Sequence, residues 1–148
     1  MIQGIENYIN LTDTKNEWAK FLNGFEWHWF FTLTFDKKVS DDLAYKQFFR
    51  WKNWIKSSVG HRIFYLIIPE RPKYKGDNTH IHGFLNGVEN EKPYIWRRKW
   101  EAMAGFSRIQ PYDSSRGASY YLADKIVFKE EDIYHSKDLN MIKINTLN

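Results

Sequence analysis

The chain has 148 residues, enough to enclose a hydrophobic core, and its length predicts a single domain over 1–148. It contains no cysteine, no apolar run of about 20 residues and no signal-peptide pattern at its start. Disulfides and thiolate sites are therefore excluded, and we expect a cytoplasmic protein without a membrane partner. The net charge is +4 and aromatic residues make up 18% of the chain. This combination is typical of proteins that bind single-stranded nucleic acid, although tryptophan also fills cores.

Hydrophobic periodicity predicts an alternating series of helices and strands. Helices are indicated by apolar residues three and four apart behind a capping residue, such as the capping box from Thr14 to Glu17. Strands are indicated by alternating or continuous runs rich in β-branched and aromatic residues. The predicted elements are helix 14–23, strand 27–35, helix 41–57, strand 63–68, strand 79–85, helix 92–104, strand 106–112 and helix 116–128.

This order of elements predicts an α+β fold with a central antiparallel sheet. Its helices are expected to pack on one face of the sheet, which leaves the other face open for a ligand. The core of the domain covers about 27–128, behind an N-terminal helical region within 1–26. The tail over 129–148 shows no clear period and receives no predicted structure.

A His-x-His pair in the third predicted strand is the clearest chemical pattern. His80 and His82 are two residues apart, so their side chains project from the same face with Cα atoms about 7 Å apart. Two such imidazoles can converge on a metal ion, but they can also be hydrogen-bonded or surface histidines. Glu70 stands just after the end of the preceding predicted strand, and antiparallel pairing would bring it towards both histidines. A loop carboxylate paired with Arg71 or Lys73 is the alternative for Glu70.

A tyrosine and a lysine share one side of the last predicted helix. Tyr121 points away from the apolar arc of this helix, and Lys125 lies one turn further along. A phenol beside a cation is the minimum for a tyrosine nucleophile, because the ammonium favours the phenolate and balances developing phosphate charge. Tyr120 lies beside Asp124 and is the weaker candidate. An exposed Tyr–Lys pair also occurs commonly without any catalytic role.

Basic residues in two segments are expected to contact the phosphates of a bound nucleic acid and to supply much of the affinity. One segment is the loop after the second predicted strand, and the other is the third predicted helix. The residues are Arg71, Lys73, Lys75, Arg97, Arg98 and Lys99.

Together these segments resemble the HUH endonucleases, and among them the replication initiator proteins of rolling-circle plasmids and single-stranded DNA viruses. Residues 31–35, Phe-Thr-Leu-Thr-Phe, resemble the first motif of that family. Glu70 followed by 80–84, His-Ile-His-Gly-Phe, resembles its metal motif, and Tyr121 to Lys125 resembles its nucleophile motif. The resemblance implies a ferredoxin-like or RRM-like sheet whose open face carries the active site.

The resemblance also implies a reaction and its partners. A tyrosine would attack a phosphate of single-stranded or hairpin DNA at an origin, leave a free 3′-OH and form a 5′-phosphotyrosine, to initiate and terminate rolling-circle replication. Mn²⁺ or Mg²⁺ would be held by His80, His82 and Glu70. The chain has no Gly-x-x-x-x-Gly-Lys-Ser/Thr motif, so no nucleotide cofactor is expected and unwinding would come from a host helicase or supercoiling. The expected location is the cytoplasm of a prokaryotic host.

Other functions are compatible with the same motifs. A transposase or relaxase of the same superfamily would use the same chemistry on another DNA. A catalytically silent module could bind single strands by stacking bases on aromatic side chains. Metal-dependent hydrolysis without a covalent step would leave Tyr121 dispensable.

Overall fold

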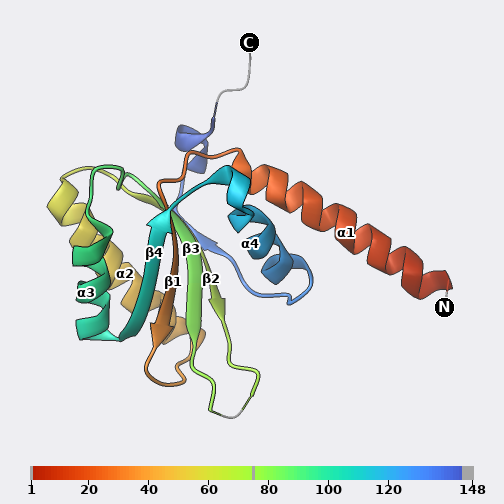
Figure 1. Ribbon diagram of the computed structural model, residues 1–148, viewed down its shortest axis with the longest axis horizontal. Helices are drawn as coiled ribbons and strands as arrows, with labels where there is room; N and C mark the ends of the chain where they lie inside the picture. Colours follow the sequence, from red (N-terminus) through yellow and green to blue (C-terminus); the bar gives the residue numbers. More distant parts are fainter. Residues whose placement is uncertain (1, 75, 145–148) are drawn as a thin grey trace.

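The computed structural model describes residues 2–74 and 76–144, with side chains from residue 10 onward, and has an α+β fold (Figure 1). It confirms the predicted fold class. Its elements are α1 (Ile2–Asn23), β1 (Trp29–Phe35), α2 (Asp41–Val59), β2 (Phe64–Glu70), β3 (His80–Asn86), α3 (Pro93–Met103), β4 (Gly105–Pro111), the 3₁₀ turn η1 (Ser114–Arg116), α4 (Ala118–Val127), β5 (Tyr134–His135) and the 3₁₀ turn η2 (Leu139–Ile142).

The strands form one sheet in the order β4-β1-β3-β2-β5, and all four neighbouring pairs are antiparallel. The elements from β1 to β4 follow the β-α-β-β-α-β order of ferredoxin-like folds. This order places β1 and β3 in the middle of the sheet. The predicted metal motif on β3 and the Thr-rich face of β1 are therefore direct neighbours.

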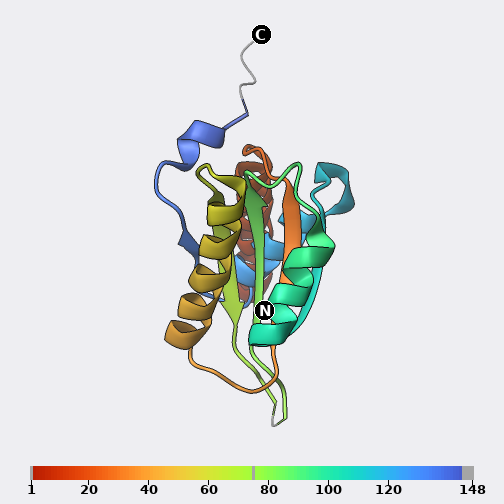
Figure 2. The same cartoon turned by 90° about the vertical axis from the view of Figure 1, so that its left-hand side faces the viewer.

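One face of the sheet is closed by α2 and α3, which lie in front of it in Figure 2. Alternate residues of β1 are buried against these helices, among them Phe31 and Leu33. The apolar stripe of α2 supplies Phe48 and Trp51, and α3 supplies Trp100. Because side chains alternate along a strand, the residues between those of β1 point to the opposite face.

The opposite face is covered only in part, by α4 and the C-terminal end of α1 (Figures 1 and 2). Leu22 of α1, Phe84 of β3 and Leu122 of α4 are fully buried in this second core cluster. The sequence predicts the helices on one face. In the structure α2 and α3 lie on one face, and α4 and the end of α1 lie on the other. The uncovered part of this second face carries the candidate site.

The helix α2 shows how local sequence bounds an element. Ser40 is its N-cap, and its hydroxyl accepts a hydrogen bond from the backbone N–H of Leu43 at 3.2 Å. Gly60 ends the helix in the left-handed conformation, with φ 75°. The predicted helix over 41–57 is thus confirmed, with two further residues at its end.

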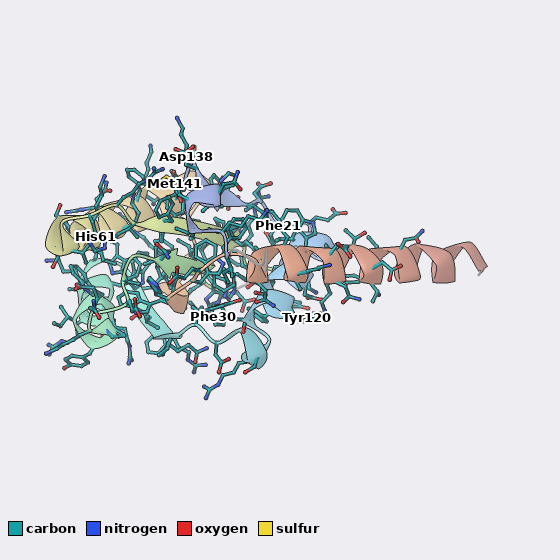
Figure 3. The ribbon with its side chains drawn as sticks, turned by 90° about the horizontal axis from the view of Figure 1, so that it is seen from above. Phe21, Phe30, His61, Tyr120, Asp138 and Met141 are labelled. Carbon is teal, nitrogen blue, oxygen red and sulfur yellow. The ribbon has the colours of Figure 1, made fainter. Side chains whose placement is uncertain are left out.

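The helix α1 begins much earlier than predicted and extends beyond the rest of the molecule (Figures 1 and 3). Thr14 does not cap it, because its hydroxyl donates to the carbonyl oxygen of Asn10 at 2.9 Å, a bond made within a continuing helix. None of the helices in the described residues is both long and apolar enough to span a membrane.

The tail, for which the sequence predicts no structure, contains one short strand. β5 pairs with β2 and adds a fifth strand to the edge of the sheet. It has only two residues, too few to show the alternating pattern of a strand in the sequence. Further on, Ile142 is buried and Lys143 forms an isolated bridge with Phe25. The tail thus packs beside the end of α1, while 145–148 lie outside the described residues.

Candidate active site

The register of the sheet brings the predicted metal ligands into one row. His80 lies opposite Glu70 on β2 and opposite Thr34 on β1, while His82 lies opposite Thr32. Directly paired residues point to the same face of a sheet. The expectation that antiparallel pairing brings Glu70 towards the histidines is confirmed.

Two threonines orient the two histidines. The hydroxyl of Thr34 lies 2.9 Å from Nδ1 of His80, and that of Thr32 lies 3.1 Å from Nδ1 of His82. Each imidazole therefore uses Nδ1 for a threonine and keeps Nε2 for another partner. Metal-binding histidines usually have their second nitrogen fixed in this way by a neighbouring polar group.

Glu70 connects the histidines to the last helix. One carboxylate oxygen, Oε2, lies 2.6 Å from Nε2 of His82, and the other, Oε1, accepts a hydrogen bond from Nζ of Lys125 at 2.8 Å. The hydrogen bond with His82 and the bond and charge of Lys125 outweigh burial and lower the pKa of Glu70 to about 2. The carboxylate is therefore ionised at neutral pH. Arg71, the alternative partner, pairs with Asp41 at 2.8 Å instead.

The helix α4 places Tyr121 over His82. The two rings meet edge to face, with centroids 5.2 Å apart, and Nζ of Lys125 lies 5.1 Å from the centroid of the Tyr121 ring. Burial alone would lower the pKa of Lys125, but Glu70 outweighs it, so this pKa stands above its usual value and the side chain is a cation. Tyr121 is 43% exposed. The Tyr121 ring is thus held in place by His82 and Lys125, and part of it remains accessible to a ligand.

These groups line one cavity of about 500 Å³. The loop between β2 and β3 adds Lys73 and Tyr74, and the edge strand β4 adds Phe106 and Arg108. The two β4 residues are not among the site residues that the motifs predict. Their signal was available in the alternation of β4, in which Ser107 and Ile109 are buried and the residues between them are exposed.

The basic residues predicted to bind DNA are not all near the cavity. In the loop, Lys73 and Arg71 line it, although Arg71 is held by Asp41 and lies 3.5 Å from Asp132. Lys75 lies outside the described residues.

The basic residues of α3 lie on the opposite side of the sheet. Arg98 stacks on Tyr94 of the same helix, and Lys99 lies over Trp54 of α2, 4.6 Å from its ring centroid. Arg97 is partly buried on this helix and accepts a hydrogen bond from Ser107 through its backbone oxygen. Their contact with DNA stays a prediction, and it would require DNA to reach the face covered by α2 and α3.

No protein-family model, curated protein or solved structure matches the chain.

The donor set fits a divalent cation. Burial lowers the pKa of His80, with a further contribution from His82, so its imidazole is neutral near pH 7 and has a lone pair to offer. Within residues 2–74 and 76–144, no three His, Asp or Glu side chains are grouped so that they could hold a metal ion. Here Glu70 is bonded to His82 and Lys125. A cation would replace the proton between His82 and Glu70. The hydroxyl of Thr32 can support either form of His82, because a hydroxyl both donates and accepts.

Proposed function

We propose that this protein nicks and rejoins single-stranded DNA through Tyr121, with a divalent metal, in the manner of the HUH endonucleases. One observation carries the proposal. Tyr121 lies in edge contact with His82 while Lys125 joins it to the Glu70 carboxylate, and all four residues line one open cavity. A nucleophile, a cation and a metal-binding set thus converge on a space that a phosphate can enter.

The reaction is an exchange of one phosphodiester for another. The phenolic oxygen of Tyr121 loses its proton to solvent and attacks phosphorus, and the bond from phosphorus to the 3′ oxygen breaks. The 3′ oxygen takes up a proton from water, leaving a free 3′-OH and a 5′-phosphotyrosine. In the reverse direction a 3′-OH attacks this ester and Tyr121 leaves. No nucleotide is needed, because the phosphoester bond is conserved.

The protein's own charges prepare this exchange. The ammonium of Lys125 stands beside the Tyr121 ring, where it stabilises the phenolate and the developing charge on the phosphate oxygens. Mn²⁺ or Mg²⁺ bound by His80, His82 and Glu70 would polarise the scissile phosphate. Glu70 contacts both His82 and Lys125, so it holds the metal-binding side chains and the Lys125 ammonium in a fixed relative position.

The substrate we propose is single-stranded or hairpin DNA at an origin of rolling-circle replication. The cavity is open, and Lys73 and Arg108 add positive charge to its lining. The chain itself has no Gly-x-x-x-x-Gly-Lys-Ser/Thr motif, so a host helicase or supercoiling would supply unwinding. Cytoplasmic replication of a plasmid or virus in a prokaryotic host is the setting we propose.

A covalent adduct is the product that tests the proposal. Wild-type protein with Mn²⁺ and a 3′-labelled single-stranded oligonucleotide should give a labelled band of protein size on a denaturing gel. Tyr121→Phe should give neither nick nor adduct, while still binding the oligonucleotide, because it lacks only a hydroxyl. Tyr120→Phe is the matched control and should keep both products. For the wild-type protein, an adduct mapped to Tyr120, cleavage without an adduct, or binding without cleavage would each contradict the proposal.

A further inference from the structure

A second cavity adjoins the candidate active site. It has a volume of about 270 Å³ and shares Thr32, Arg108 and Tyr121 with the first cavity. Phe30 and Gln110 also line this second cavity, whereas the metal-binding side chains line only the first. Phe30 on β1 is paired with Gln110 on β4. This pair lies two residues along each strand from the pair formed by Thr32 and Arg108, on the same face of the sheet. The two cavities therefore follow one another along these strands, with Tyr121 common to both.

The walls of this second cavity offer the two kinds of contact that an unpaired base requires. Phe30 is half-buried and meets the Tyr121 ring at 6.3 Å between centroids, so an aromatic surface borders the space. Gln110 is exposed on β4 and carries one amide donor group and one carbonyl acceptor. Within the part of the chain that the structure describes, its side chain has no hydrogen-bond partner. Proteins that read single strands combine stacking on a ring with hydrogen bonds to the base edge.

We propose that this cavity binds the base next to the scissile phosphate and that Gln110 makes it selective for adenine. The inference rests on the proposed function, because Tyr121 marks where the phosphate is attacked. A strand with its phosphate at Tyr121 in the first cavity places a neighbouring nucleotide in the second. A glutamine amide accepts from N6 of adenine and donates to N7, and on that edge no other base sets an amino donor beside a ring-nitrogen acceptor. Arg108 lines both cavities and is placed to contact the phosphate between them.

A cleavage experiment tests the selectivity. A pool of 3′-labelled single-stranded oligonucleotides with random sequence is nicked with Mn²⁺, and the bases around each nick are sequenced. Adenine should be favoured about tenfold at one of the two positions flanking the nick. Gln110→Leu should remove this preference and leave preferences at other positions unchanged. Asn16→Leu, a substitution of an exposed amide on α1, is the matched control and should keep it.

A binding experiment separates this inference from the proposed function. Tyr121→Phe protein, which does not need to cleave, is titrated without metal against oligothymidine of about 12 nucleotides, with and without a single internal adenine. The adenine should strengthen binding several-fold, and the Gln110→Leu, Tyr121→Phe double variant should lose that gain. Failure of wild-type nicking with the binding result intact would overturn only the proposed function. No adenine preference in either assay, or a preference that survives Gln110→Leu, would overturn the base site.

Discussion

Glu70 is the residue on which the two halves of the candidate site depend. It is reached by His82 from the sheet and by Lys125 from α4, and only 16% of its side chain is exposed. Replacing it leaves a buried cation and an imidazole without their acceptor, which costs more than the loss of one exposed ion pair. Its effects should therefore appear in both stability and metal use.

The first prediction concerns the pH dependence of stability. The pKa of Glu70 is about 2 in the folded protein against an ordinary 4.5, so the folded state favours the charged form. This contribution is present above pH 4.5 and is lost as pH falls towards 2. Glu70→Gln cannot titrate, so its free energy of unfolding should fall less steeply than that of the wild type over this interval. Urea unfolding followed at several pH values measures the difference, and equal slopes would contradict it.

The second prediction concerns the metal. His80→Ala should abolish Mn²⁺ binding in calorimetry and nicking in the gel assay, while affinity for single-stranded DNA persists, because phosphate contacts supply most of that affinity. Glu70→Ala should raise the Mn²⁺ concentration needed for nicking. His135→Ala, at an exposed histidine on β5, is the control and should bind Mn²⁺ as the wild type does. Full nicking in excess chelator would refute the metal assignment.

At the scale of the element, α4 is the part that turns a histidine-bearing sheet into a site with a nucleophile. It docks through Leu122 and Ala123, both fully buried, and through Ser119, whose hydroxyl donates to Asn23 of α1 at 2.7 Å. This docking sets the direction of the Tyr121 side chain. Neighbouring helical positions differ by about 100°, so only one orientation of α4 points Tyr121 at His82.

The third prediction tests that docking. Leu122→Ala removes a fully buried side chain between α4 and the sheet, and should lower the free energy of unfolding by about 2–5 kcal/mol. Leu43→Ala makes the same substitution at a helical position that is 40% exposed, and should change stability by about 0.5 kcal/mol or less. Urea unfolding of both variants gives the comparison. Similar losses for the two would mean that α4 is not held by this contact.

At the scale of the whole molecule, the positive charge is divided between the two faces of the sheet. Lys73 and Arg108 line the active-site cavity, whereas Arg98 and Lys99 lie on α3, across the sheet. A short strand that fills the cavity reaches only the first pair. The net charge of +4 therefore does not act as one surface.

The fourth prediction follows from this division. Replacing Lys73 and Arg108 by Gln should weaken binding of a short single strand. The slope of log affinity against log salt should also become shallower, by about 0.7 for each phosphate that the variant no longer neutralises. Replacing Arg98 and Lys99 by Gln should leave the slope unchanged for the same oligonucleotide. An equal reduction in both variants would show that DNA also reaches α3, as the sequence predicts.

Local patterns in the sequence were enough to predict most of the helices and strands and the chemical groups that they carry. Burial of apolar residues at helical or strand spacing is a local property, so α2, β1 and the His-x-His strand could be predicted with their faces. The two-residue spacing of His80 and His82 likewise put both on one face before any contact was known. The residues of the tail and the start of α1 could not be predicted, because a two-residue strand and a continued helix leave no period of their own.

Most of the contacts among these residues became known only from the packing of the folded chain. Strand register confirmed the predicted place of Glu70 beside the histidines, whereas the order β4-β1-β3-β2 brought Arg108 and Gln110, which no motif predicts, to the same side as the site. The docking of α4 chose where Tyr121 points, and the packing of α3 on the other face carried Arg98 away from the cavity. These outcomes depend on contacts between segments far apart in the chain. Such segments pack according to their shape and the area that they bury, and the local periodicity of a sequence gives no information about either.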